Sequence, residues 1–265
     1  MATSDAPLSV QNVALTVNDL QKTGDFYQSV IGLDQLSSDG EAMVLGKDGL
    51  PLVELRRDAK ARPRPQEAGL FHTAFLLPDR AALGRWLRFA AETGLRLDGA
   101  SDHLVSEALY LRDPEGNGIE IYVDRPRAMW TKNGDQIVMD TLPLDIQALL
   151  RLADQPWSGA PSGTVVGHVH LQVGDIPTVE GFMSEKLGMQ RVAHIPSASF
   201  FSTGGYHHHL AGNIWNSRGA GRRSPDAAGL AEVVLAADHT AANFAGTEVE
   251  DPWGNRFRVI AKPAA

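Results

Sequence analysis

The 265-residue chain contains no cysteine, which excludes disulfides, thiolate metal sites and a cysteine nucleophile. No apolar run approaches the ~18–20 residues that span a bilayer. The N-terminal sequence MATSDAPLSV lacks the basic start and apolar stretch of a secretory signal. A net charge of -8, with a pI near 5.6, argues against nucleic acid or an anionic membrane as a partner. We therefore expect a cytoplasmic enzyme or binding protein whose metal ligands, if any, are His, Asp or Glu.

One short pattern occurs twice with a histidine at the same place. In each of LFHTAFLLPD and VGHVHLQVGD, a histidine lies seven residues before an aspartate, and a helix is expected to begin at that aspartate. The aspartate itself recurs four times along the chain. Counting back seven residues from Asp19, Asp79, Asp175 and Asp238 gives Asn12, His72, His168 and Ala231. This spacing indicates an internal fourfold repeat.

Each repeat predicts a strand, a helix and three further strands. Amphipathic helices are expected over Leu20–Ile31, Ala81–Thr93 and Ile176–Leu187, each followed by a glycine suited to a left-handed C-cap. The sequence predicts an α+β fold of four βαβββ modules, paired into two cup-shaped half-barrels. We expect an N-terminal pair of modules at residues 1–125, a connector at 126–163 with a short helix, and a C-terminal pair at 164–265.

Two histidines and one glutamate are the candidate metal ligands. His72 and His168 occupy equivalent positions in two modules, and Glu120 lies on the closing strand of the second module. Two neutral imidazoles and a carboxylate form the set that suits non-heme Fe(II). A lone strand histidine is more often a hydrogen-bonded core residue, and His170, on the same face as His168, is an alternative ligand. The coincidence of three positions favours the metal site.

This ligand set also predicts how the modules pair. The second and third modules must face each other to bring His72, Glu120 and His168 together. The first and fourth modules offer Asn12, Ala231 and Arg258 instead, and a cationic arginine cannot bind a divalent ion. We therefore expect one metal cup and one structural cup.

The chain resembles the vicinal oxygen chelate superfamily, which includes glyoxalase I, bleomycin-resistance proteins and extradiol dioxygenases. The segments that carry the resemblance are GLFHTAFLLPDRAALG, ASDHLVSEALYLRDPEGNGIEIYVDRP, VVGHVHLQVGDI and FFSTGGYHHHLAGNIW. Within the superfamily, the catechol 2,3-dioxygenase-like group of four-module proteins is the most similar. The resemblance implies the vicinal oxygen chelate fold, a metal ligand at Glu120 and a homodimer.

The resemblance also implies two catalytic residues near Glu120. Extradiol dioxygenases carry a tyrosine at the separation that Tyr110 has from Glu120, and it hydrogen-bonds the substrate oxygen. His103 stands where the family often has a further histidine. The alternatives are an ordinary half-buried strand tyrosine and a loop histidine that faces solvent.

Three consecutive histidines, His207, His208 and His209, form a further candidate. Ring-cleaving relatives place an acid–base histidine in the equivalent strand, and the match points to His208, with His207 or His209 as alternatives. An imidazole suits proton transfer near neutral pH. We expect a strand over His207–Trp215, and an adventitious metal-binding tract is the competing interpretation. The candidate substrate-binding residues are His207, His209, Asn213, Trp215 and His170.

Together these residues favour an extradiol-type ring-cleaving dioxygenase that acts on a small aromatic diol with O2 and Fe(II), or Mn(II) in its place. A glyoxalase-like isomerase or transferase is one alternative, for which Zn or Ni would be expected. A non-catalytic protein that binds a small aromatic molecule is another.

Overall fold

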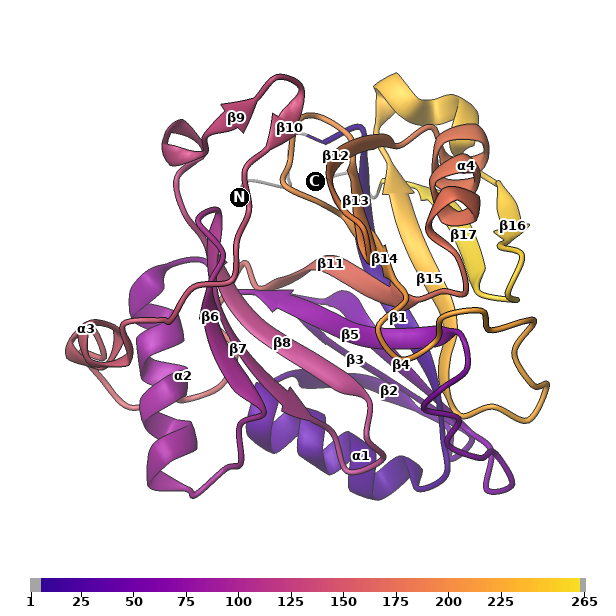
Figure 1. Cartoon of the computed structure of the whole chain (residues 1–265). Helices are drawn as coiled ribbons and strands as arrows, with labels where there is room; N and C mark the ends of the chain where they lie inside the picture. The colour runs from indigo at the N-terminus through magenta and orange to yellow at the C-terminus, as the bar shows by residue number, and fades with distance from the viewer. Residues whose placement is uncertain (1–5, 263–265) are drawn as a thin grey trace.

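The computed structural model describes residues 6–262, and most of its strands form two curled sheets (Figure 1). The first module contains one helical segment, between its first and second strands. It consists of β1 (Leu8–Val17), α1 (Leu20–Phe26) continued by the π-helical η1 (Tyr27–Ile31), β2 (Asp34–Ser38), β3 (Ala42–Lys47) and β4 (Leu50–Arg57). The second module has the same order: β5 (Gly69–Leu76), α2 (Arg80–Glu92), β6 (Gly99–Asp102), β7 (Ser106–Arg112) and β8 (Gly118–Asp124).

The third module repeats this order and the fourth is shorter. The third consists of β11 (Val165–Gln172), α4 (Ile176–Leu187), β12 (Gln190–Ile195), β13 (Ala198–Ser202) and β14 (Leu210–Asn213). The fourth consists of β15 (Gly229–Ala237), the 3-10 helix η3 (His239–Phe244), β16 (Glu248–Glu250) and β17 (Arg256–Ala261). The fourth repeat is therefore incomplete among the described residues, with two strands rather than three after its helical segment.

The sheet order pairs the modules as the ligand set predicted. The eight-stranded sheet runs β12-β13-β14-β11-β5-β8-β7-β6 and joins the third module to the second. The seven-stranded sheet runs β16-β17-β15-β1-β4-β3-β2 and joins the fourth to the first. The predicted fold of paired half-barrels and the pairing of modules two and three are confirmed.

Local sequence signals explain the helix boundaries. The side chains of Asp19, Asp79 and Asp175 each accept a hydrogen bond from a backbone N–H in the first turn of the helix that follows. Gly32 and Gly188 end their helices with φ of 82° and 62°, a left-handed conformation that a side chain disfavours.

Alternation along the strands separates the hydrophobic core from the concave faces. On β8, Ile119, Ile121 and Val123 belong to the main buried cluster, so Glu120 points to the opposite, concave face. On β5, Phe75 likewise joins the main cluster, whereas Ala74 belongs to a small separate cluster. The sheet thus presents its polar positions to the hollow of the cup.

The connector runs from the end of β8 to the start of β11. It contains η2 (Arg127–Met129), β9 (Lys132–Asn133), β10 (Gln136–Ile137) and α3 (Ile146–Arg151), the short helix that was predicted. The α3 helix lies beside α2 (Figure 1), where Gly84 allows a close approach because a Cβ there would lie 2.5 Å from the Leu149 carbonyl oxygen. The division of the chain at residues 126–163 stays a prediction. Among residues 6–262, no helix is long and apolar enough to cross a membrane.

Candidate active site

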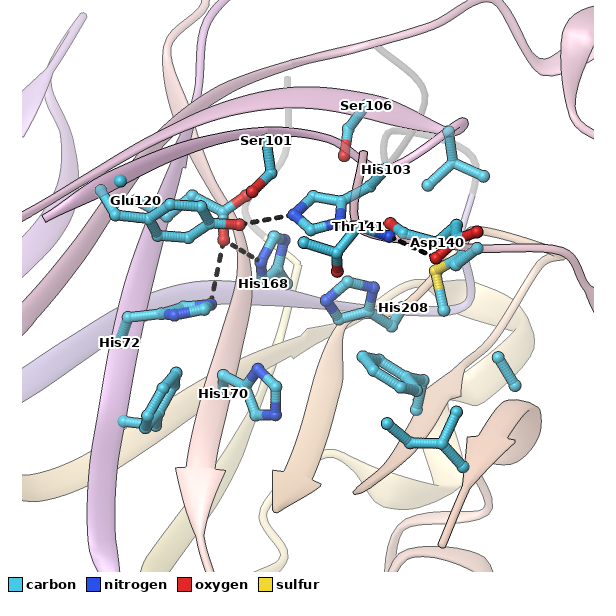
Figure 2. A pocket seen from close by; sticks show the side chains of 18 of the residues that line it. His72, Ser101, His103, Ser106, Glu120, Asp140, Thr141, His168, His170 and His208 are labelled. Atoms are coloured by element: carbon cyan, nitrogen blue, oxygen red, sulfur yellow. Dashed lines mark hydrogen bonds and ion pairs between the residues drawn. The ribbon is translucent and has the colours of Figure 1, made fainter. Parts of the chain in front are cut away.

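Three buried side chains from three neighbouring strands converge at the bottom of the metal cup. His72 projects from β5, Glu120 from β8 and His168 from β11. Their candidate ligand atoms all lie within 4.8 Å of one another. Glu120 Oε2 lies 3.0 Å from His72 Nε2 and 3.2 Å from His168 Nε2, and Figure 2 shows the three side chains pointing together. Three residues that lie far apart in the sequence thus meet at one point because their strands are neighbours in the sheet.

A β-bulge puts His168 on the concave face. In the β5–β11 ladder, Phe75 pairs with Val166 but Ala74 pairs with His168, which leaves Gly167 as the extra residue. A regular ladder would pair Ala74 with Gly167 and turn His168 toward the core, because a shift of one residue reverses the face. Gly167 is required there, since a Cβ would lie 1.8 Å from the Tyr122 hydroxyl.

The protonation states of this cluster suit a divalent cation. Burial lowers the pKa of His168 to about 4, so its imidazole is neutral at pH 7. Burial opposes ionisation of Glu120, but the neighbouring His168 and His72 outweigh it and hold the pKa of the carboxyl well below its usual value. Moreover, the buried Nε2 of His72 lies 3.0 Å from Glu120 Oε2 but not in the geometry of a hydrogen bond. An unpaired buried nitrogen aimed at a carboxylate is what a metal ligand would leave without its ion.

A cavity of about 770 Å³ opens above the three side chains. Aromatic rings form part of its wall, and the connector supplies its roof through polar and apolar residues between 133 and 141. The aromatic members are Phe71, Tyr110, Phe200 and Trp215, and Trp215 is 47% exposed. The cup is therefore partly covered by a segment that belongs to neither of the two large sheets.

Tyr110 and His103 lie together beside Glu120. Tyr110 on β7 pairs with Glu120 on β8, and its hydroxyl lies 2.6 Å from His103 Nε2. The other ring nitrogen, Nδ1, lies 2.7 Å from the carbonyl oxygen of Asp140 in the connector. Burial, and then the charge of Glu120, raise the pKa of Tyr110 well above 10, so its hydroxyl stays protonated. Both residues line the cavity, as the resemblance implied.

The predicted substrate-binding residues divide into two groups. His170 and Trp215 line the cavity, with ring centroids 5.2 Å apart, and burial lowers the pKa of His170 well below 6.5. In contrast, His207, His209 and Asn213 are fully buried and lie outside the cavity wall. The structure does not bring these three residues into contact with the cavity.

The expected strand over His207–Trp215 is wrong at both ends, because β14 covers only Leu210–Asn213. The strand β14 starts at Leu210, and the histidine tract lies in the irregular segment before it. Its side chains therefore do not alternate between faces, and the rings of His207 and His208 instead contact each other. His208 is the member that lines the cavity, with its ring centroid 4.1 Å from that of His168.

The second sheet carries ion pairs at the equivalent positions. Ala14 on β1 pairs with Glu54 and Glu232, as Ala74 on β5 pairs with Glu120 and His168. The equivalence expected for Ala231 is therefore wrong, because Ala231 is the bulged residue that corresponds to Gly167. The acidic side chains are neutralised by arginine: Arg56 binds Glu54 at 2.7 Å, and Arg258 binds Glu232 at 2.9 Å. Among residues 6–262, only His72, Glu120 and His168 form a three-ligand group.

Sequence reasoning missed Asp124 and the connector residues of the roof. Asp124 lies four residues after Glu120 on β8 and thus on the same face, which was a readable signal. Its partners come from the segment before β14 and follow from no sequence pattern. The roof residues, such as Asp140 and Thr141, sit in a stretch with little regular structure and could not be placed from periodicity.

Comparison with known proteins agrees with this arrangement. Residues 9–121 match the Glyoxalase/Bleomycin resistance protein/Dioxygenase superfamily. The chain is 38% identical over 260 residues to the catechol-2,3-dioxygenase of Bacillus subtilis, an alignment that covers 92% of this chain and 90% of the relative. The crystal structure of glyoxalase I from Zea mays shares the fold, with a TM-score of 0.57 over 96% of this chain and 92% of the maize chain, at 14% identity. The chain therefore belongs to the glyoxalase/bleomycin resistance protein/dioxygenase superfamily.

Proposed function

We propose that the protein is an extradiol-type ring-cleaving dioxygenase that acts on a catecholic substrate with Fe(II) and O2. The observation that carries the proposal is the convergence of His72, Glu120 and His168 below a large cavity. The similarity to a catechol-2,3-dioxygenase supports the same chemistry. In this proposal the three side chains hold the ion, and Mn(II) could replace Fe(II) because its ligand preferences are close.

The bound ion would supply a Lewis acid that holds the diol oxygens beside dioxygen. The protein residues then have separate tasks. The aromatic wall formed by Phe71, Phe200 and Trp215 would position the ring, and its apolar surface would exclude water. His170, kept neutral by burial, adds no charge that would compete for the diol.

His208 and Tyr110 are the proposed proton-handling residues. The His208 imidazole, in the cavity wall beside His168, would accept a proton from one diol hydroxyl and return it later in the reaction. The Tyr110 hydroxyl, protonated because burial raises its pKa, donates to His103 in this structure and would turn that proton to the reacting oxygen when the diol binds. In the balanced reaction one C–C bond beside the diol breaks, and both oxygen atoms of O2 enter the ring-opened semialdehyde.

The residue of β14 that is equivalent to Glu120 argues against a glyoxalase-like isomerase. Four protein ligands are generally expected for that activity. In the second module, Ala74 on β5 pairs with Glu120 on β8. The equivalent residue of the third module, His170 on β11, pairs with Ala211 on β14. A methyl side chain therefore stands where a fourth ligand would come from. The open coordination positions that result are those that a diol and dioxygen would need.

The test is oxygen uptake by the Fe(II)-loaded protein. Protein loaded under nitrogen should consume one O2 per catechol and form a yellow product when air is admitted. The variants His72→Ala, His168→Ala and Glu120→Ala should lose both bound iron and turnover. His239→Ala, at an exposed histidine far along the chain, is the matched control and should retain both. Iron bound in stoichiometric amount without oxygen uptake across a panel of substituted catechols would refute the proposal.

Metal content separates the remaining alternatives. Protein purified without added metal should contain iron or manganese. Zinc or nickel, together with isomerisation of a hemithioacetal without oxygen, would instead identify a glyoxalase-like enzyme. Tight binding of an aromatic ligand by metal-free protein without turnover would identify a binding protein.

A further inference from the structure

A chain of hydrogen bonds runs behind the cavity wall and ends at His208. His207 Nε2 lies 2.9 Å from Asp124 Oδ1, and His207 Nδ1 lies 2.8 Å from His208 Nδ1. His207 is fully buried, and the Asp124 side chain is only 11% exposed. Neither residue lines the cavity, so neither can contact a substrate there.

The direction of these hydrogen bonds follows from the chemistry of Asp124. The Tyr122 hydroxyl lies 2.7 Å from that of Tyr206, and the Tyr206 hydroxyl donates to Asp124 Oδ1 at 3.1 Å. Burial raises the pKa of both phenols well above 10, so they act as donors. An ionised carboxylate only accepts, and Asp124 Oδ1 therefore receives a second hydrogen bond from His207 Nε2–H.

The proton on His207 Nε2 determines which nitrogen donates in the hydrogen bond between His207 Nδ1 and His208 Nδ1. A neutral imidazole carries one ring proton, so His207 Nδ1 is left as an acceptor. His208 must then donate from its own Nδ1, which leaves Nε2 without a proton. We propose that Asp124 and His207 are positioning residues that fix His208 in the Nδ1–H tautomer, with an unprotonated Nε2 available to the cavity. The use of that nitrogen as a base rests on the proposed function, whereas the tautomer itself does not.

Packing holds the rings in this arrangement. The His207 ring packs against those of Tyr206 and Trp130, with centroids 4.1 Å and 5.3 Å away. The His208 ring packs against His168, with centroids 4.1 Å apart. A rotated His208 would lose the Nδ1 partner and bury an unpaired polar nitrogen, which costs roughly 1–3 kcal/mol. This penalty exceeds the thermal energy and selects one ring orientation.

The decisive measurement is the tautomer of His208 in the full-length, metal-free protein. Nitrogen-15 NMR of the imidazole rings distinguishes protonated from bare ring nitrogens, and the His208 signals are assigned by their absence in His208→Gln. We expect a bare Nε2 and a protonated Nδ1 on His208, with the reverse on His207. A protonated Nε2 on His208, or an imidazolium at His207, would overturn the inference.

Variants test the cause of the tautomer. His207→Phe and Asp124→Leu remove an acceptor, and both should transfer the His208 proton to Nε2. Asp124→Asn should keep the wild-type tautomer, because its amide oxygen can occupy the Oδ1 site and its NH2 group the site of Oδ2, which has no partner. Glu107→Gln, a change to another buried carboxylate outside the cavity, is the control and should leave the His208 signals unchanged. An unchanged His208 tautomer in folded His207→Phe would contradict the positioning role.

Kinetics provide a separate readout in the iron-loaded protein. His207→Phe should lower kcat by about 100-fold, the lower end of the range for loss of general-base catalysis, with little change in KM. Asp124→Asn should restore most of the kcat lost in Asp124→Leu. If the protein proves not to cleave catechols, the proposed function fails while the NMR result still decides the tautomer. A merely structural role would lower stability equally in the leucine and asparagine variants without moving the proton.

Discussion

The Tyr110 hydroxyl donates to His103 Nε2 across 2.6 Å, and His103 in turn donates from Nδ1 to the Asp140 carbonyl. The carbonyl fixes which ring nitrogen carries the proton, because it can only accept. The position of the tyrosine is thus linked to the connector that covers the cavity.

Replacing Tyr110 by phenylalanine should lower kcat about 10–100-fold, the effect of losing one strong hydrogen bond to a reacting oxygen. KM should change little if the bond forms mainly in the transition state. Oxygen uptake at saturating catechol measures the effect. Tyr27→Phe is the matched control, since Tyr27 is also buried and bonds Asp113 away from the cavity. Equal losses in both variants would assign Tyr110 a structural role only.

Removing the metal should lower thermal stability. A ligand that binds only the folded state stabilises it by an amount that grows with its concentration, about 2.7 kcal/mol at one hundred times Kd. Calorimetry should therefore show a higher Tm for wild-type protein with Fe(II) than with chelator, and no difference for Glu120→Ala. A Tm increase that persists in Glu120→Ala would indicate that the ion binds elsewhere.

Acidification should destabilise the metal-free protein, in part through His209. Burial lowers the pKa of His209 from 6.5 to about 3. Between these values the unfolded chain binds more protons than the folded one, so the free energy of unfolding falls as the pH falls. At about 1.4 kcal/mol per pH unit, His209 should account for about 2 kcal/mol between pH 6.5 and 5.

The variant His209→Phe isolates this contribution. Its free energy of unfolding, measured by urea denaturation, should decline by about 2 kcal/mol less than that of wild type over the same interval. Some decline should persist, because burial lowers the pKa of His168, His170 and His208 as well. Parallel pH curves for the two proteins would show that His209 does not contribute.

Gly167→Ala should destabilise the fold by about 1–3 kcal/mol, the usual cost of an overpacked core position. The added methyl would meet the Tyr122 hydroxyl, so Tyr122→Phe should recover part of the loss in a double-mutant cycle. Gly181→Ala is the control, because that helical glycine faces open space and alanine favours a helix. Thermal unfolding of wild type, the Gly167→Ala and Tyr122→Phe variants and the double variant measures the coupling between the two side chains. Strict additivity would show that the two side chains do not clash.

The sequence predicted those features that repeat. The aspartate caps, the glycines after the helices and the equivalent positions of His72 and His168 follow from local patterns, and they sufficed to pair the modules. Features that depend on irregular backbone were not predictable. The tract at residues 207–209 was expected to alternate like a strand, yet it precedes one. Likewise, counting from Asp238 selected Ala231 rather than Glu232, because Asp238 follows Glu232 one residue sooner than Asp175 follows the equivalent His168, a difference that a fixed spacing does not reveal.

The bulge at Gly167 has a consequence for how such a site can arise or disappear. Both sheets retain an extra residue at this point, and the residue after it faces the hollow in each: a histidine in one and a glutamate in the other. Insertion or deletion of one amino acid there would therefore change which side chain points into the cup, although the sequence would still contain every metal-ligand residue. In a protein built from duplicated modules, a one-residue change in strand length can therefore distinguish a homologue that keeps the site from one that keeps only the fold.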